Sequence, residues 1–198
     1  MSNTADESDL VMASRTIAEA FRDDPVWGSV LESGHLGADT AELWRFFLLE
    51  ARRSGTLHMT GERADAVAVW IAPGHDEITA GDTAALRELI ARRLPDRVAL
   101  VDQLFEVFEK HRPTEPHAYL SLLATHPRHR GRGIAQEMLR ADLAIWDARE
   151  VPTYLESSNP ANDHRYARLG YRARERFLAP ASGAPVTTMW RAIGGGEP

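Results

Sequence analysis

The residues of this chain best suited to chemistry lie in a basic, glycine-containing turn between an apolar strand and an amphipathic helix. Gly131 and Gly133 lack the Cβ atoms that would keep an anion away from the backbone. Arg128, Arg130 and Arg132 concentrate positive charge in a chain whose net charge is −6. The helix that follows begins with unpaired N–H groups and the positive end of a dipole, so the turn predicts an anion site. It matches neither a Walker loop nor the GxGxxG fingerprint, and a solvated surface turn is the alternative.

Two segments repeat, in order, the motifs of one known superfamily. Residues 130–135 (RGRGIA) fit the pattern (R/Q)-x-x-G-x-(G/A), and residues 153–171 contain LESS, then Asn162, then YARLGY. On these residues the chain resembles the GNAT superfamily of N-acetyltransferases, particularly its puromycin N-acetyltransferase-like members. Shorter stretches resemble the same members, at residues 20–26, 66–70 and 111–116.

The resemblance implies where acetyl-CoA binds. The strands at residues 122–125 and 154–157 would splay apart, with pantetheine in the wedge between them and the pyrophosphate on the turn. Main-chain donors near Leu123 and Thr125 would stabilise the developing oxyanion. By this resemblance the cofactor-binding residues are Leu123, Ala124, Thr125, Arg130, Gly131, Arg132, Gly133, Ile134, Ala135 and Asn162. A helix-capping role behind Pro160 is the alternative for Asn162.

Two proton transfers accompany the attack of an amine on a thioester. Tyr166 matches the family's acid for the leaving group, and a phenol with an ordinary pKa of about 10 can donate to a thiolate. An ordinary half-buried tyrosine is the alternative. Glu156 is the leading candidate for the base, since partial burial beside the wedge would raise its pKa. Pairing with an arginine, or capping of the backbone, would instead make Glu156 structural, and His117 or Tyr119 could then serve as the base.

The acceptor pocket is expected to combine carboxylates with aromatic rings. The substrate-binding candidates are Asp24 with its neighbour Asp23, Trp27, His58, Trp70 and Tyr119. Such a set suits an amine on an aromatic or cationic body, through ion pairing and cation–π attraction. The alternatives are core packing for the tryptophans and a helix-ending turn at Asp24.

The spacing of apolar residues predicts alternating helices and strands. Helices are expected at residues 8–23, 39–54, 82–94, 96–110, from 134 onward and 161–168, and strands at 64–72, 117–125, 151–157, 171–178 and 186–192. The helix from residue 134 is expected to cover the sheet with the stripe Ile134, Met138, Ala141 and Ile145, flanked by Leu139, Leu143 and Trp146, and to leave Arg140, Asp142 and Asp147 on other faces. The order indicates an α/β protein. With the resemblance, it implies a single-domain GNAT-type fold with a mixed, mostly antiparallel sheet, splayed central strands and flanking helices.

Length and composition fit one globular domain over residues 1–198, with about 8–192 ordered and 193–198 a disordered tail. No apolar run is long enough to span a membrane. The first residues do not resemble a signal peptide and cysteine is absent, so the cytoplasm is the expected location. The net charge of −6 argues against nucleic-acid binding, and no histidine pair at ligand spacing indicates a metal.

The resemblance therefore implies an acetyl-CoA-dependent, metal-free N-acetyltransferase that works by direct attack of a small-molecule amine, such as an antibiotic or another metabolite. Cysteine and a G-x-S-x-G elbow are both absent, which leaves no obvious covalent route. A protein or peptide N-acetyltransferase and a non-catalytic acyl-CoA-binding sensor are the alternatives. We expect a monomer or a homodimer.

Overall fold

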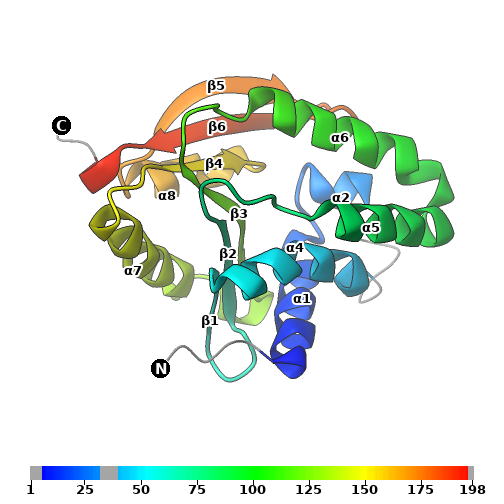
Figure 1. Ribbon diagram of the computed structural model, residues 1–198, viewed down its shortest axis with the longest axis horizontal. Coiled ribbons are helices and arrows are strands. Elements are labelled where there is room, and N and C mark those ends of the chain that lie inside the picture. The colour runs from blue at the N-terminus through cyan, green and yellow to red at the C-terminus, as the bar shows by residue number, and fades with distance from the viewer. Residues whose placement is uncertain (1–5, 32–39, 196–198) are drawn as a thin grey trace.

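The computed structural model describes residues 6–31 and 40–195. In this part of the chain, helices cover both faces of one six-stranded sheet (Figure 1). The helices are α1 (Glu7–Phe21), α2 (Trp27–Val30), α4 (Thr40–Ser54), α5 (Ala80–Arg93), α6 (Val98–His111), α7 (Ile134–Ala148) and α8 (Asp163–Ala167). The strands are β1 (Leu57–Thr60), β2 (Ala66–Ile71), β3 (Ala118–Thr125), β4 (Thr153–Ser157), β5 (Arg172–Leu178) and β6 (Pro185–Arg191).

Local sequence signals account for several of these boundaries. α1 begins with a capping box, in which the side chains of Asp6 and Asp9 each accept the other residue's backbone N–H at 2.9 Å. α5 and α6 are separated by a short 3₁₀ turn that starts at Pro95. Proline has no N–H to donate and its ring blocks a continuous helix. The predicted split at this residue is confirmed.

The sheet has the strand order β1-β2-β3-β4-β6-β5, and every neighbouring pair is antiparallel except β3 and β4. In Figure 1, β1, β2 and β3 run down the view whereas β4, β6 and β5 run across it. The sheet is therefore divided into two differently oriented halves that meet at the single parallel pair. This arrangement confirms the predicted mixed, mostly antiparallel sheet with splayed central strands.

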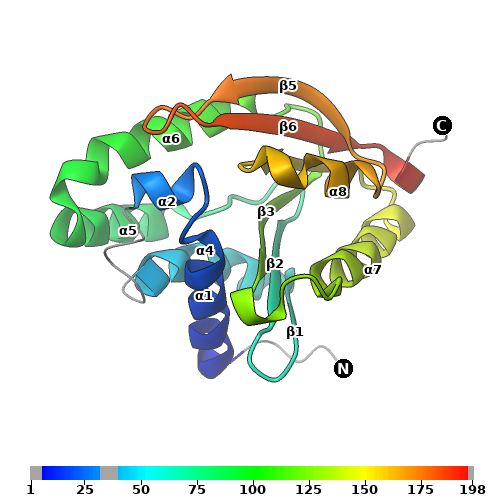
Figure 2. The same ribbon diagram turned by 180° about the vertical axis from the view of Figure 1, so that it is seen from behind.

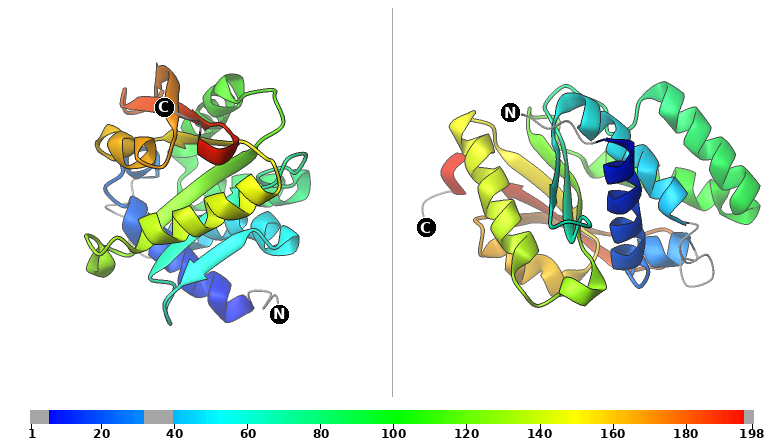
Figure 3. Two further views of the ribbon diagram at one scale, coloured as in Figure 1. Left: turned by 90° about the vertical axis from the view of Figure 1, so that its left-hand side faces the viewer. Right: turned by 90° about the horizontal axis from the view of Figure 1, so that it is seen from below.

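Alternating side chains of the strands pack into two separate hydrophobic cores. Val67 and Val69 of β2 point into a large cluster with α1, α4, α5 and α6, whereas Ala68 and Trp70 point into a smaller one beneath α7. Figure 3 shows α7 on one side of these strands and α1 on the other. Within the described ranges, no helix combines the length and the apolar character that crossing a bilayer requires.

The face that α7 turns to the sheet differs from the predicted one. Its buried residues are Leu139, Asp142, Leu143 and Trp146, while Ile145 is 42% exposed. The residues predicted to flank the stripe, Leu139, Leu143 and Trp146, are thus the ones that face the core, whereas the prediction that Ile145 faces the sheet and Asp142 does not is wrong. The physical reason is a polar partner across the core, because buried Asp142 accepts hydrogen bonds from two side chains of the sheet.

Short elements account for most of the remaining differences. The spacing of apolar residues did not predict β1 or α2, which have four residues each. The first three residues of the expected disordered tail, Ile193–Gly195, form a short 3₁₀ turn whose Gly194 N–H donates to Asp147 at 2.8 Å. The rest of that tail, residues 196–198, lies outside the described residues, as does the predicted helix start at residue 39.

Candidate active site

The two central strands separate as a fork. β3 and β4 pair over three residues only, from Ala118 opposite Thr153 to Leu120 opposite Leu155. Beyond this point β3 continues along β2 and β4 continues along β6. The backbone edges that face into the fork therefore have no strand to pair with, as the predicted wedge requires.

A β-bulge in β3 marks the point of separation. Leu120 and Leu122 lie opposite consecutive residues of β2, which leaves Ser121 as an extra residue. A bulge bends its strand and increases the local twist, so it helps to turn β3 away from β4. The Ser121 hydroxyl donates a hydrogen bond to the carboxylate of Glu77, which is contributed by the loop before α5.

A cleft of about 1260 Å³ opens in the fork. Its walls come from the α1–α2 loop, α6, the loop before α5, β3, β4, the turn before α7, and α8. The volume exceeds the roughly 300–1,000 Å³ of ordinary small-molecule sites, so there is room for two substrates. The predicted site residues that line it are Asp24, Trp27, Tyr119, Leu123, Thr125, Arg130, Gly131, Gly133, Ile134, Ala135, Glu156, Asn162 and Tyr166.

The glycine turn presents a row of unused backbone donors. Gly131 and Gly133 have φ angles of 79° and 77°, in the left-handed region that glycine adopts most easily. Gly133 directly precedes α7, and the first bond to the helix interior comes from Glu137 N–H to the Gly133 carbonyl at 3.0 Å. Within the described residues, no acceptor occupies the N–H groups of residues 131–136. Such a row suits a phosphate.

Arg130 is held in place beside this row. Its guanidinium donates to the carbonyl oxygen of Ala20, at the end of α1, at 2.8 Å. Figure 2 shows the turn before α7 passing close to α1. The positive charge of Arg130 is thus fixed on the cleft wall. Predicted Arg132 is instead exposed and outside the cleft lining, with its side chain 3.4 Å from the His129 ring.

Glu156, on the β4 side of the fork, has a carboxylate that is shielded from solvent. Both of its oxygens are shielded from solvent, and neither has a hydrogen bond of ordinary geometry within the described residues. Burial raises the pKa of Glu156 to about 7, although the Arg112 guanidinium and the Tyr119 and Tyr154 hydroxyls lie close enough to oppose the rise. The predicted structural alternative, direct pairing with an arginine, is not observed for this residue.

Arg112 is the main cation near Glu156, and it already has partners. It contacts Glu77 at 3.2 Å and Glu109 at 3.5 Å, and its guanidinium carbon lies 4.2 Å from the centre of the Tyr119 ring. Nearby Tyr119, Glu77 and Glu156 raise the pKa of Arg112, despite its burial. Arg112 therefore stays charged and lowers the cost of ionising Glu156 without neutralising it.

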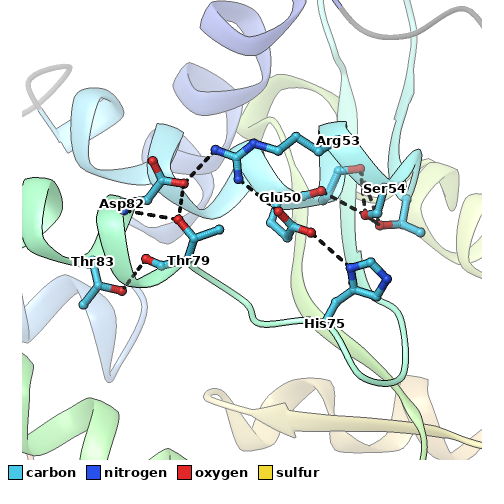
Figure 4. A network of polar contacts seen from close by, with 9 residues as sticks. Glu50, Arg53, Ser54, His75, Thr79, Asp82 and Thr83 are labelled. Carbon is cyan, nitrogen blue, oxygen red and sulfur yellow. Dashed lines mark hydrogen bonds and ion pairs between the residues drawn. The ribbon is translucent and has the colours of Figure 1, made fainter.

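The loop that carries Glu77 is anchored by a polar network between α4 and α5 (Figure 4). Glu50 of α4 accepts from the His75 ring at 3.1 Å, and Arg53 bridges Glu50 at 2.9 Å and Asp82 at 2.7 Å. These contacts hold both ends of the loop before α5. Glu77 is thereby placed where it can hold both Ser121 of the bulge and Arg112 of the cleft.

Tyr166 lies on α8 and lines the cleft. Burial, followed by the charges of Asp24 and Asp163, raises the pKa of Tyr166 to about 12. Its hydroxyl has no hydrogen-bond partner within the described part of the chain. The phenol therefore stays protonated at neutral pH and is free to donate to a ligand.

The predicted acceptor residues Asp24, Trp27 and Tyr119 all line the cleft. Trp27 is only 8% exposed and belongs to the large hydrophobic core, so the core-packing alternative also applies to it. Asp24 also has a structural role, because one oxygen accepts the N–H groups of Val26 and Trp27 at 3.0 Å. Its other oxygen accepts the Ser158 hydroxyl at 2.7 Å. Burial raises the pKa of Asp24, and these hydrogen bonds oppose the rise.

Three other predicted site residues lie away from the cleft. His58 and Trp70 point to the α7 face of the sheet. There the carboxylate of Asp142 accepts hydrogen bonds from His58 Nδ1 at 2.5 Å and from the Trp70 indole N–H at 2.9 Å. Ala124 is buried against α1. The prediction that these three residues line the site is wrong. Side chains along a strand alternate between the two faces of the sheet, and these three point away from the cleft. Trp70 has the core-packing role that was the alternative.

Asn162 lines the cleft with its side chain free of any capping bond. The turn ahead of it is capped instead by Asn159, whose side chain accepts the Ala161 N–H at 3.0 Å. The alternative, a capping role for Asn162, is therefore wrong. Its amide remains available to a ligand.

Sequence reasoning missed Glu77, Arg112 and Ser121 as members of the site. Arg112 belongs to the stretch 111–116 that resembles the family, so that match offered a signal. Glu77 and Ser121 carry none, since their contact joins positions 44 residues apart through a bulge that only the assembled sheet reveals.

Comparison with known proteins agrees with this geometry. Residues 98–173 match the family model of the acetyltransferase (GNAT) domain. In fold, the chain is similar to an acetyltransferase described with the histone acetyltransferase HPA2 from Corynebacterium glutamicum, at 20% identity and a TM-score of 0.65 over 98% of this chain and 95% of that one. It is also similar to an N-acetyltransferase from Staphylococcus aureus Mu50, at 15% identity and a TM-score of 0.59 over 94% and 97%.

A third solved structure with this fold is arylalkylamine N-acetyltransferase 2 from Aedes aegypti, at 13% identity and a TM-score of 0.55 over 93% and 94% of the two chains. At these identities the solved structures show the fold alone. The family model matches the segment that contains most of the candidate site. That segment, residues 98–173, includes both strands of the fork, the glycine turn and α8. Over residues 98–173 the chain therefore matches the acetyltransferase (GNAT) domain, and its fold is similar to that of solved acetyltransferases.

Proposed function

We propose that this protein transfers the acetyl group of acetyl-CoA directly to the amine of a small molecule. The observation that carries the proposal is the carboxylate of Glu156, shielded in the cleft and without a hydrogen bond of ordinary geometry within the described residues. Oxygens that are shielded and accept no hydrogen bond are costly, so such a carboxylate suits a site for a cationic ligand. A pKa of about 7 suits proton removal from an ammonium group near neutral pH.

The glycine turn is the proposed site for the pyrophosphate of CoA. The unused N–H groups of residues 131–136 would donate to its oxygens, and Arg130 would add a fixed positive charge. Asn162 lines the same cleft with a free amide. Acetyl-CoA supplies the thioester when it is bound. Main-chain donors at Leu123 and Thr125, on the open edge of β3, would then polarise the acetyl carbonyl.

Two side chains would handle the protons. Glu156 takes one from the acceptor ammonium, directly or through a water, which leaves a neutral amine that can attack. Tyr166, with a pKa of about 12, is protonated at neutral pH and donates its proton to the departing sulfur. Because the amine itself is the nucleophile, no side chain has to form a covalent bond.

An aromatic wall supports a small acceptor rather than a protein. The Trp27 ring stacks on Phe108 at 6.0 Å between centroids and lies 6.2 Å from Phe105. All three rings line the same cleft as Asp24, and Trp27 and Phe108 are 8% and 7% exposed. A flat organic body with an amine fits such a wall. The ordered motif matches further support a relationship to puromycin N-acetyltransferase-like members, and with it a role in antibiotic detoxification.

A panel of amines tests the proposal through free-thiol release from acetyl-CoA. The panel contains puromycin, simple alkylamines, arylalkylamines and short peptides with free α-amino or lysine groups. We expect turnover with small amines. Turnover with peptides alone would instead identify a protein acetyltransferase. Calorimetric binding of CoA without turnover of any amine would identify a non-catalytic sensor.

A further inference from the structure

A buried ion pair outside the cleft joins the end of β6 to the end of α7. Arg191, the last residue of β6, is 7% exposed, and its two terminal nitrogens donate to the two carboxylate oxygens of Asp147 at 2.7 and 2.8 Å. Asp147 lies one residue before the end of α7, and both residues are outside the cleft lining. A buried pair is tolerated when its geometry is good, and this bidentate pair leaves the Arg191 Nε for a third contact.

The third contact reaches the turn that ends α8. Arg191 Nε donates to the carbonyl oxygen of Leu169 at 2.8 Å. Leu169 lies between α8 and β5, and its own N–H donates to the carbonyl of Tyr166 at 2.9 Å. The Tyr171 N–H donates to the same carbonyl at 3.3 Å. The backbone of Tyr166 is therefore part of the turn that Arg191 holds.

The C-terminal segment packs directly against this turn. Gly170 has a φ of 91°, and a Cβ atom there would lie 2.7 Å from the carbonyl oxygen of Gly195. Gly195 belongs to the 3₁₀ turn Ile193–Gly195, in which the Gly194 N–H donates to Asp147 at 2.8 Å. The carboxylate that orients Arg191 thus also holds the segment that packs against Gly170.

α8 needs such external support because it has only five residues, and helices of this length are not stable alone in water. At its first residue, Asp163 accepts a hydrogen bond from the Thr187 hydroxyl at 2.9 Å. Thr187 and Arg191 share one side of β6, since alternate residues of a strand face the same way. Figure 2 shows α8 lying along β6. Two side chains of one strand therefore hold the two ends of the helix that carries Tyr166.

The geometry points to Arg191 as a positioning residue for acetyl transfer, which fixes the place of Tyr166 in the cleft by holding the turn after α8. This inference rests on the proposed role of Tyr166 as the acid. The Tyr166 hydroxyl makes no hydrogen bond within the described residues, so its place depends on the backbone of α8 and on packing against the Tyr171 ring, 6.1 Å away between centroids. A reacting group displaced by about 1 Å can lose roughly 100-fold in rate.

A lysine substitution tests the link to α8 in the full chain. Arg191→Lys keeps a cation for Asp147, but one ammonium group cannot reproduce the planar fork that also reaches Leu169. With acetyl-CoA and a reactive amine both saturating, kcat from thiol release should fall about 10-fold. KM for acetyl-CoA should change little, because the glycine turn is at the other end of α7.

Arg87→Lys is the matched control. Arg87 also donates to an aspartate, Asp102, through Nε at 3.2 Å and a terminal nitrogen at 2.9 Å, and both residues lie outside the cleft lining. This pair joins α5 to α6 and has no contact with α8 among the described residues. The control should leave kcat unchanged.

A double-mutant cycle distinguishes positioning from general support of the fold. If Arg191 acts through Tyr166, then Arg191→Lys should change kcat by less than about twofold in a protein that already carries Tyr166→Phe. A merely structural role would give the same loss in both backgrounds. Circular dichroism and calorimetric binding of CoA verify that each variant is folded. If Arg191→Lys does not fold, Asp147→Asn takes its place in the cycle, because it weakens the ion pair and keeps Arg191.

Fluorine NMR follows Tyr166 independently of activity. The chain has four tyrosines, so labelling with 3-fluorotyrosine should give four signals, each assigned by a Tyr→Phe substitution. Arg191→Lys should shift the signal of Tyr166 and leave those of Tyr119 and Tyr154 in place. Arg87→Lys should leave all four in place.

The results that overturn this inference differ from those that overturn acetyl transfer. An unchanged kcat or an unchanged Tyr166 signal in the folded variant, or an equal loss of kcat in both backgrounds, would refute positioning by Arg191 and leave the proposed function intact. The absence of thiol release by the wild type with every amine, despite binding of CoA, would refute the proposed function and this inference with it.

Discussion

Replacing Glu156 with glutamine should make the protein inactive and, above neutral pH, more stable. The substitution keeps the size of the side chain and removes its charge. If Glu156 is the base, activity is lost with the carboxylate. The same carboxylate is shielded and lacks a hydrogen bond within the described residues. Removing its charge therefore also removes the free-energy cost of keeping it ionised in the folded state.

The size of that cost follows from the pKa. Burial raises the pKa of Glu156 from its ordinary 4.5 to about 7, a value that already includes the attraction of Arg112. At about 1.4 kcal/mol per pKa unit, ionised Glu156 destabilises the folded state by about 3 kcal/mol. Between pH 4.5 and 7 the folded protein keeps a proton that the unfolded chain has lost. The contribution to stability therefore falls as pH rises through this window and is constant above it.

Urea unfolding at pH 5 and pH 8.5 measures this effect. Glu156→Gln should exceed the wild type in unfolding free energy by up to about 3 kcal/mol at pH 8.5 and by much less at pH 5. Glu88→Gln, at an exposed glutamate of α5 outside the cleft lining, is the control and should change neither value. In parallel, kcat/KM for a reactive amine should rise in the wild type with an apparent pKa near 7. In Glu156→Gln it should fall by roughly 10²–10⁴-fold and lose that rise.

Two outcomes would refute this reasoning. If Glu156→Gln is no more stable than the wild type at pH 8.5, the carboxylate is not held at a cost. If the variant keeps the activity and its rise near pH 7, another group is the base.

Three further predictions concern the turn, the acid and the opposite face of the sheet. Gly133→Ala should lose about 1–2 kcal/mol of stability and raise KM for acetyl-CoA, because φ is 77° at this residue. The control Gly81→Ala in α5 should do neither. If Gly133→Ala and the wild type have equal KM values for acetyl-CoA, the turn does not bind CoA. Tyr166→Phe should lower kcat by roughly 10²-fold or more with KM for acetyl-CoA little changed, and an unaltered kcat would eliminate it as the acid. Asp142→Ala should lower the unfolding free energy in urea by about 2–4 kcal/mol, since it leaves the buried Trp70 indole and the His58 ring without their acceptor. The kcat/KM of the folded fraction should stay unchanged. A large loss of activity without a loss of stability would contradict a purely structural role for Asp142.

The helices and strands that the sequence predicted correctly are those with long periodic patterns or strong stop signals. The break at Pro95 and the strand at residues 117–125 are examples, the latter observed as Ala118–Thr125. The four-residue elements β1 and α2 were missed, because four residues contain too little periodicity to distinguish them from a loop.

The exact face of a helix and the side of a strand proved harder to predict. Ile145 is exposed and Asp142 is buried, the reverse of the apolar-stripe expectation. Trp70 was expected in the pocket but lies beneath α7. In both cases a polar contact between α7 and the sheet, the bond from the Trp70 indole to Asp142, determines the outcome. Such a contact joins residues 72 positions apart and leaves no local pattern.

By itself, the sequence determined the chemistry that is local in the chain. The glycines of residues 130–135, the helix that follows them and the order of the family motifs are all contiguous, so short-range backbone preferences and motif matches are enough to recognise them. Only the tertiary structure decided that β3 and β4 part at Ser121, that the Glu156 carboxylate is shielded without a hydrogen bond, and that Glu77 and Arg112 join the wall of the cleft. Burial and charge depend on which distant segments pack together, and those contacts exist only once the chain is folded.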